Sequence, residues 1–373
     1  MTTSWRKIIM WSLVGTTFAV VLILANLALT FDTLGGLVVA GPTEPSAPII
    51  EHDIPGYPTT EAGEHDGKFF YVMAREPMHL HSVAAGLDRP RYRLQRILFP
   101  WLVWILHPTG GGVGLVWAMF AVGVLGIFAG SVASGALSMH LRGPPWPAVA
   151  FGLMTGSLVS LRISTPDPLA TALVFWALWF LLRKRLGWAL LLGVAAALTK
   201  ETTVLFLIGY AMWRRDRDSL IAVAVPIVAA GSWWLWLRSQ FPEVGNQVTE
   251  IVTPFSGWAH AIDFWSRGYE PLGWLSFGIA IGVGIAALIK GRLRHPFGWA
   301  ILINLLMFIV LSTSAIAPER SAGRTTMGEL MLAIIVLATA RNLPEGLRGR
   351  PDGASEQVSV PNEDAGAVGK RSG

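Results

Sequence analysis

Long apolar runs separated by short polar junctions occupy most of the chain. The first run covers residues 8–30 and directly follows Arg6 and Lys7. It is longer than the apolar core of a signal peptide, so we expect an uncleaved membrane helix whose N-terminus faces the cytoplasm. Further runs cover residues 112–139, 146–161, 168–182, 187–213, 219–237, 272–289, 297–313 and 325–340. This pattern predicts an all-α, polytopic membrane protein.

The composition favours the same class. Hydrophobic residues make up 53% of the 373 residues and charged residues 14%, with a mean hydropathy of +0.51. Soluble domains carry about a quarter charged residues. The chain has no cysteine, which excludes disulfides and thiolate metal sites. Its net charge of +5 comes from short basic clusters between apolar runs, which indicates membrane topology rather than nucleic-acid binding.

Basic clusters determine the predicted topology. They lie at Arg142, residues 183–185, 214–217 and 290–294, and in the C-terminal tail. Because basic loops stay in the cytoplasm, we expect the remaining junctions outside. Residues 187–213 have a basic cluster at each end, so they are predicted to cross twice, with Lys200 and Glu201 at the outer tip. One long helix that buries this Lys–Glu pair is the alternative. About ten crossings result, with both termini cytoplasmic.

The predicted domain organisation is simple. Residues 1–341 form one transmembrane domain, in which residues 31–111 are a long first extracytoplasmic loop with juxtamembrane helices. Residues 342–373 are rich in Gly, Pro and charge without apolar periodicity, which predicts a disordered cytoplasmic tail.

Two amphipathic segments are expected at the outer surface. Residues 93–107 are short for a crossing and predict a juxtamembrane helix broken near Pro100, with an ordinary transmembrane helix as the alternative. In the loop at residues 240–271, apolar positions from Val248 to Ile262 recur at helical spacing, which predicts an interfacial helix.

Many charged residues fall on the predicted outer face. A charge at the centre of a bilayer costs roughly 2.5–3.5 kcal/mol on insertion scales, so these residues imply a water-filled outer cavity. Both signs are present, which suits a substrate with an anionic group and a hydroxyl to be activated. The residues that we expect to bind substrate are Glu64, Tyr71, Arg75, Arg93, Arg96, Asp167, Lys200, Glu201, Arg320 and Arg324.

Asp66, in the sequence EHDGKFFY, is the predicted catalytic residue. Gly67 would let the backbone approach a ligand closely, and the aromatic residues that follow would anchor a short helix in the membrane surface. A carboxylate fixed there could act as a general base. The alternative is that Asp66 only caps the helix, and the sequence leaves the two readings equally open.

The arginine pairs suggest a phosphate group. Arg93 and Arg96 share a helical face, as do Arg320 and Arg324, and guanidinium groups match phosphate oxygens at two points. Arginine side chains that reach for the interface are the alternative. The cofactor is open: a hard divalent metal held by Asp66 and Asp167 is compatible with the residue types.

The order of these motifs resembles the GT-C superfamily of membrane glycosyltransferases. After a first helix come an Asp-Gly-aromatic motif, the segment RYRLQRILFPWLVW, the loop Ser-Thr-Pro-Asp-Pro, the sequence AALTKET and a late arginine-bearing loop. The resemblance covers roughly residues 5–341 and extends to protein O-mannosyltransferases, aminoarabinose transferases and glycosylphosphatidylinositol mannosyltransferases. It implies a GT-C-like fold in a bacterial plasma membrane.

The resemblance also implies an activity. A sugar would pass from a polyprenyl-phosphate donor to a hydroxyl of a glycan, lipid or protein acceptor on the outer face, with inversion at the anomeric carbon. Asp66 would be the base, and Lys200, Arg320 and Arg324 match donor-phosphate positions. The partners expected are thus this donor, the acceptor and the lipid bilayer. A transporter or flippase of lipid-linked sugars, a polysaccharide polymerase or ligase, and a non-catalytic protein of envelope assembly are the alternatives.

Overall fold

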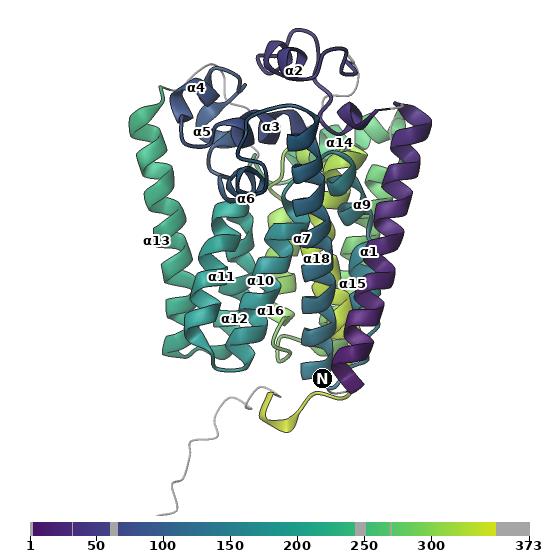
Figure 1. Ribbon diagram of the computed structural model, residues 1–373. Coiled ribbons are helices and arrows are strands. Elements are labelled where there is room, and N and C mark those ends of the chain that lie inside the picture. The colour runs from purple at the N-terminus through teal and green to yellow at the C-terminus, as the bar shows by residue number, and fades with distance from the viewer. Residues whose placement is uncertain (1–2, 32, 60–65, 243–250, 269–270, 348–373) are drawn as a thin grey trace, which may run out of the picture.

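The computed structural model describes residues 3–31, 33–59, 66–242, 251–268 and 271–347. These residues form an upright bundle of helices with a layer of short helices at one end (Figure 1). The bundle helices are α1 (Thr3–Thr30), α7 (Val113–His140), α8 (Pro147–Leu153), α9 (Thr155–Arg162), α10 (Asp167–Leu182), α11 (Leu186–Thr199), α12 (Val204–Arg214), α13 (Arg217–Gln240), α15 (Pro271–Gly291), α16 (Gly298–Phe308) and α18 (Glu319–Thr339). Within the described ranges, β pairing is limited to two isolated bridges, so the all-α prediction is confirmed.

Among the described residues, five helices are long and apolar enough to cross a membrane. They are α1, α7, α13, α15 and α18, and three shorter apolar helices, α10, α11 and α16, stand among them. The chain is therefore a helical, multi-pass membrane protein. The figure of ten crossings stays a prediction.

Residues 187–213 form the predicted hairpin. Helix α11 ends at Thr199, Lys200 is extended with φ −158° and ψ 115°, and the 3₁₀ turn η2 (Glu201–Thr203) leads into α12. At the other end of the hairpin, Lys184 and Arg214 line the same small pocket, so the chain turns back on itself. The alternative of one long helix is wrong.

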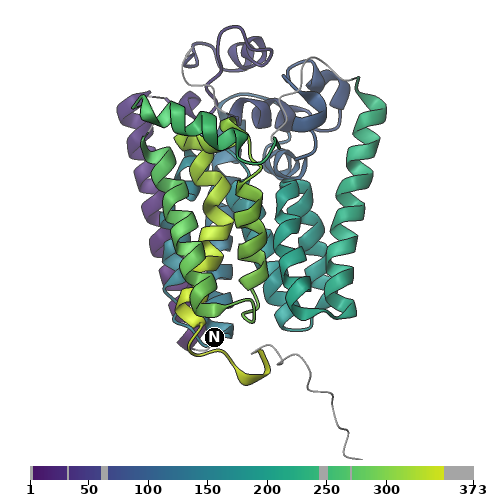
Figure 2. The same ribbon diagram turned by 180° about the vertical axis from the view of Figure 1, so that it is seen from behind.

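The basic clusters gather at one end of the bundle, called here the basic end. Lys184 lies beside Arg214, the Trp213 indole donates to the Arg294 carbonyl at 2.9 Å, and Lys290 donates to the Leu337 carbonyl at 2.6 Å. The N-terminus and the end of α18 lie there too (Figures 1 and 2). This arrangement agrees with the predicted alternation of loops. Which end faces the cytoplasm stays a prediction.

The opposite end, called here the cap end, carries short helices. They are η1 (Leu34–Leu37), α2 (Ala47–Asp53), α3 (Gly67–Arg75), α4 (Leu80–Ala84), α5 (Pro90–Arg93), α6 (Leu98–Leu106), α14 (Ser256–Ser266) and α17 (Thr313–Ile316). The juxtamembrane helix predicted at residues 93–107 is present as α6, but the break lies at residues 94–97 instead of Pro100. Pro100 is the third residue of α6, where the missing N–H has no helical partner to lose.

The run at residues 146–161 is also broken. Met154 has φ −64° and ψ 140°, which separates α8 from α9. A side-chain carbon at Gly156, in α9, would collide with the carbonyl oxygen of Gly323, in α18. Absence of a side chain therefore lets α9 and α18 approach closely, and Arg324 follows Gly323 directly.

The loop at residues 240–271 contains the predicted interfacial helix, but it begins only at Ser256. Val248 lies outside the described residues. Before α14 the chain pairs with the loop after α16: the amide of Val252 donates to the carbonyl of Val310 at 2.8 Å, and that of Phe255 to Ile309 at 2.8 Å. Phe255 itself is left-handed, with φ 65°, and forms part of a turn. Backbone pairing with another loop thus replaces the first helical turn that the apolar spacing predicted.

Regular structure continues past residue 341. A 3₁₀ turn, η3 (Glu345–Leu347), follows α18, and Leu343 is buried. The predicted start of the disordered tail, residue 342, is therefore too early in the sequence. Residues 348–373 lie outside the described part of the chain.

Candidate functional site

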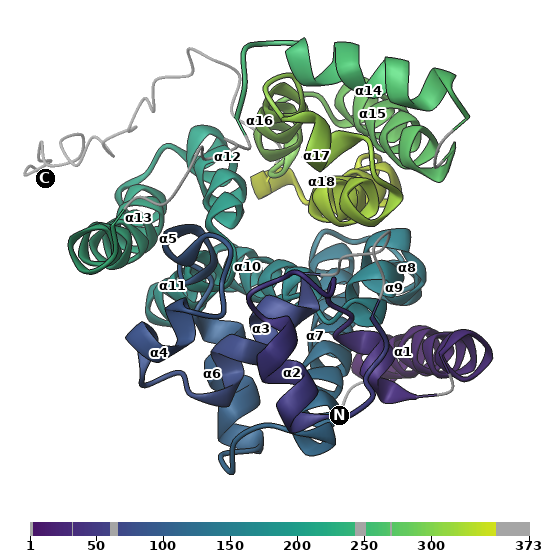
Figure 3. The same cartoon turned by 90° about the horizontal axis from the view of Figure 1, so that it is seen from above.

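A cavity of about 940 Å³ opens at the cap end. This cap-end cavity is lined by the start of α3, the segment at residues 88–96, the start of α10, the hairpin tip, the end of α16 and the start of α18. Figure 3 shows the arrangement of these helices from above. Its charged lining residues are Asp66, Lys68, Asp88, Arg89, Arg93, Arg96, Asp167, Lys200, Glu201, Arg320 and Arg324. Its apolar wall includes Trp234, Ile251, Met307, Phe308 and Leu311. Cavities of this size hold ligands as large as a drug molecule.

Local sequence fixes Asp66 at the edge of this cavity. Gly67 follows it and starts α3, where a side-chain carbon would collide with the carbonyl oxygens of Ile163 and Leu37. The predicted close approach at Gly67 is therefore real, but its partner is the protein's own backbone and not a ligand. Only glycine fits here, and the packing of α3 holds the preceding carboxylate in place.

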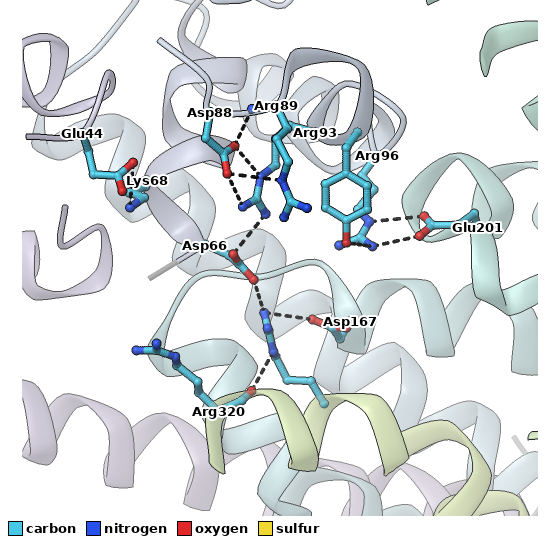
Figure 4. Close-up of polar contacts among 12 residues, drawn as sticks. Glu44, Asp66, Lys68, Asp88, Arg89, Arg93, Arg96, Asp167, Glu201 and Arg320 are labelled. Atoms are coloured by element: carbon cyan, nitrogen blue, oxygen red, sulfur yellow. Dashed lines mark hydrogen bonds and ion pairs between the residues drawn. The ribbon is translucent and has the colours of Figure 1, made fainter. Parts of the chain in front are cut away.

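Asp66 lies between two arginines. Its Oδ1 accepts from Nη1 of Arg93 at 3.1 Å, and its Oδ2 from Nη1 of Arg324 at 2.8 Å (Figure 4). Asp66 occupies the N-cap position of α3, yet its side chain makes no capping hydrogen bond. The capping alternative is therefore wrong, and the side chain faces the cavity.

The two arginines keep Asp66 charged. Burial by itself raises the pKa of this carboxyl group, but the charges of Arg324 and Arg93, with a smaller contribution from Arg96, hold the pKa well below its usual range. Asp66 is thus a carboxylate throughout the neutral pH range, able to accept a proton only when these charges are offset.

Arg93 is held firmly by other residues. Asp88 accepts two hydrogen bonds from it, at 2.9 Å and 3.0 Å, and the guanidinium lies 3.9 Å from the centre of the Phe69 ring. Asp88 and Phe69 are site residues that the sequence did not predict. Their signal was an acid just before the Pro90 that starts α5, and an aromatic residue three positions after Asp66.

Further ion pairs line the cavity. Arg96 pairs with both carboxylate oxygens of Glu201, at 2.9 Å and 3.2 Å. Lys200 donates to Asp167 at 2.6 Å, and Asp167 is also 3.9 Å from Arg324. The extended backbone at Lys200 and the prolines beside Asp167 position these groups. The structure thus brings together Asp66, Arg93, Arg96, Asp167, Lys200, Glu201, Arg320 and Arg324, as predicted.

Arg320 differs from the other arginines of the cavity. Its carbonyl oxygen accepts from Nε of Arg324 at 2.7 Å, which fixes the stem of Arg324 one helical turn away. Within the described ranges, no carboxylate lies within ion-pair distance of the Arg320 guanidinium, although Arg320 lines the cavity. This side chain is therefore available to an anion.

Tyr71 and Arg75 do not line the cavity, so the structure does not bring them together with the other residues predicted to bind substrate. The Tyr71 hydroxyl donates to Asp53 at 3.0 Å and accepts from the amide of Gly112 at 2.5 Å, while Arg75 lies 2.9 Å from Asp53. These two residues, one turn apart on α3, face α2 and the start of α7. Glu64, the remaining predicted residue, lies outside the described residues.

The two acids predicted for a metal do not fit one in this arrangement. Nη1 of Arg324 lies 2.8 Å from Asp66 and 3.9 Å from Asp167, between the carboxylates that would have to share the ion. Nor does any group of three His, Asp or Glu side chains converge within the described part of the chain.

No protein-family model, no curated protein and no solved structure matches the chain.

Proposed function

We propose that the protein is an integral membrane glycosyltransferase that moves a sugar from a polyprenyl-phosphate donor to an acceptor hydroxyl. The observation that carries the proposal is the position of Asp66. One of its oxygens contacts Arg324. The preceding turn of the same helix bears Arg320, a cavity arginine whose guanidinium contacts no carboxylate among the described residues. A base and an anion-binding pair thus stand side by side, as transfer from a phosphate requires.

The charge of the cavity supports an anionic substrate. Seven basic side chains line it against four acidic ones, an excess of three positive charges. Arg320 and Arg324 can bind phosphate oxygens at two points each, and Lys200 adds a point charge at the hairpin tip. A membrane protein gathers so many charges at a considerable free-energy cost, which points to a function.

The apolar wall supports a lipid chain on this anion. Trp234 and Ile251 line the cavity, and both are exposed large apolar side chains. An isoprenoid chain leaving the cavity between them would stay in contact with apolar side chains and reach the bilayer. The phosphate and the lipid thus find complementary surfaces in one cavity.

The reaction is a single displacement. The acceptor oxygen attacks the anomeric carbon of the sugar while its proton passes to Asp66, so a new carbon–oxygen bond forms. The bond between that carbon and the phosphate oxygen breaks, and the electron pair leaves with the phosphate. Arg320, Arg324 and Lys200 stabilise the charge that develops there. Attack opposite to the leaving group inverts the anomeric carbon. A glycan, lipid or protein in the envelope of a bacterium supplies the hydroxyl.

A donor panel tests this function. Membranes containing the protein are given labelled polyprenyl-phosphate sugars, and transfer to endogenous acceptors is followed for the wild type, Asp66→Asn and Asp53→Asn. We expect Asp66→Asn to lower the rate by about 10²–10⁴-fold, the usual effect of losing a general base, and Asp53→Asn to remain active. Transfer by Asp66→Asn at the wild-type rate with every donor would refute the assignment. Asp167→Asn is measured in the same way, and a loss of transfer in this variant alone would show that Asp167, and not Asp66, is the base.

A further inference from the structure

The two arginines that share Asp66 are held in different ways. Arg93 makes two hydrogen bonds to Asp88 and stacks on Phe69 in addition to its contact with Asp66. Arg324 is bound through Nε to the carbonyl of Arg320, and its charge has one close carboxylate, Asp66, since Asp167 is 3.9 Å away and bonded to Lys200. Arg93 is therefore a fixed partner of Asp66, whereas Arg324 can release Asp66 and bind another anion in its place.

An anion can be attracted to the immediate surroundings of Arg324. Arg320 stands one turn earlier on α18, lines the same cavity and contacts no carboxylate in the described ranges. An anion drawn to Arg320 would therefore arrive beside Arg324. Nε of Arg324 already donates to the Arg320 carbonyl, so an oxyanion that binds at two points must use the edge formed by Nη1 and Nη2. Nη1 is the group that donates to Asp66, and the anion would therefore compete with Asp66 for it.

We infer that the phosphate of the donor displaces Asp66 from Arg324, so that donor binding itself frees the catalytic carboxylate. This inference rests on the proposed function. Before exchange, both oxygens of Asp66 accept hydrogen bonds from guanidinium groups. After exchange, Oδ2 is free to accept the acceptor's proton, while Arg93, locked by Asp88, keeps the side chain in position.

The charge that develops during the reaction favours the contact between Arg324 and the phosphate over the contact between Arg324 and Asp66. A sugar phosphodiester carries one negative charge, and its phosphate gains a second as the anomeric bond breaks. Arg324 is therefore held more tightly by the phosphate as Asp66 takes up the proton. The expected consequence is an order of binding in which the lipid donor enters before the acceptor hydroxyl is activated.

A double-mutant cycle on binding tests the exchange without any catalytic step. The probe is farnesyl methyl phosphate, a diester with the single charge and isoprenoid chain of the donor class. Its dissociation constant is measured on the full-length protein in detergent for the wild type, Asp66→Asn, Arg324→Gln and the double variant. Such cycles isolate the coupling between two residues.

If Asp66 competes with the phosphate for Arg324, Asp66→Asn tightens binding by about fivefold or more, the range of typical coupling between sites. This gain disappears when Arg324 is already Gln. The gain from Asp66→Asn should remain in the background of Arg320→Gln, the matched control one turn away, because the Arg320 side chain does not contact Asp66. An equal gain in the Arg324→Gln background would show simple repulsion between two anions, and would overturn the exchange.

Two further outcomes are informative. If the wild type fails to bind the probe, the proposed function fails and takes the exchange with it; binding without any gain from Asp66→Asn overturns the exchange alone. Should Arg324→Gln not fold, Asp66→Asn is compared with Asp167→Asn. Asp167 retains Lys200, so the exchange requires the larger gain from Asp66→Asn, and equal gains would contradict it.

Discussion

Arg96 forms a two-point ion pair with Glu201, although the two residues are 105 positions apart. The pair connects the segment between α5 and α6 to the tip of the α11–α12 hairpin. Tyr92 joins it, since its hydroxyl accepts from Arg96 at 2.9 Å. The cap end is thus attached to the bundle by charge as well as by apolar contact.

Removing one partner of this pair should destabilise the protein. Arg96→Gln and Glu201→Gln are each expected to cost about 1.5–3 kcal/mol, the usual net value of hydrogen bonds to charged groups. The double variant should lose less than the sum, because neither partner is left alone. Thermal unfolding in detergent measures the three effects, and strict additivity would show that the pair contributes nothing jointly.

The ion pairs also predict an acid limit of stability. Burial raises the pKa values of Asp88 and Glu201, but Arg93 and Arg96, respectively, outweigh it and lower both. A carboxyl group whose pKa is lowered on folding stabilises the fold above its unfolded value of about 4, and this contribution is lost as the pH falls through the lowered folded value. The melting temperature should therefore stay level from pH 7 to about 5 and fall below about 4. Glu201→Gln should show a smaller acid-induced fall; an equal fall would exclude Glu201 as a source.

Single cysteines test the topology without background, because the chain has no cysteine. A cysteine at Thr202, on the hairpin tip, should react with an impermeant maleimide in intact cells. A cysteine at Lys184, an exposed residue of the basic end, should react only after permeabilisation. The reverse labelling pattern would show that the protein has the opposite orientation in the membrane, and the proposed reaction at the outer face would be wrong.

Gly67 should tolerate no side chain. Gly67→Ala would push the backbone of α3 away from Ile163 and Leu37, and overpacking of this kind costs about 1–3 kcal/mol. Gly187→Ala is the matched control, since no atom lies within 4 Å of the added carbon and alanine favours a helix. Equal melting temperatures for the two variants would show that α3 adjusts easily.

Two buried tyrosines provide a test of where Tyr71 acts. Tyr71→Phe leaves Asp53 and the Gly112 amide each short of a partner, which should cost about 1–3 kcal/mol. Tyr57→Phe should be neutral, because the Tyr57 hydroxyl is buried without a hydrogen-bond partner in the described structure. Sugar transfer per folded molecule should be unchanged in both. A loss of transfer in Tyr71→Phe alone would indicate that Tyr71 does contribute to substrate binding.

The length of the apolar runs and the spacing of the basic clusters predicted the helices, the hairpin and the grouping of most site residues. They failed where packing between distant segments decides the outcome. The break at Met154 and the direction of Tyr71 depend on what α9 and α3 meet in the bundle. Helices that are apolar on all sides carry no periodic signal of their inner face, so a sequence alone cannot orient them. Asp88 could not be predicted as a site residue, because its role is to hold Arg93 and that contact is visible only in the folded chain.

The ion pair between Asp66 and Arg324 spans 258 positions of the chain. During synthesis at about 5–20 residues per second, roughly 10–50 s pass between the appearance of the two residues at the ribosome. Throughout that time Asp66 lacks one of its two arginines, and the cavity lacks the helix that completes it. A chain cut short before α18 would therefore insert most of its apolar helices and still have no assembled site, so the synthesis of α18 decides when a new molecule becomes competent.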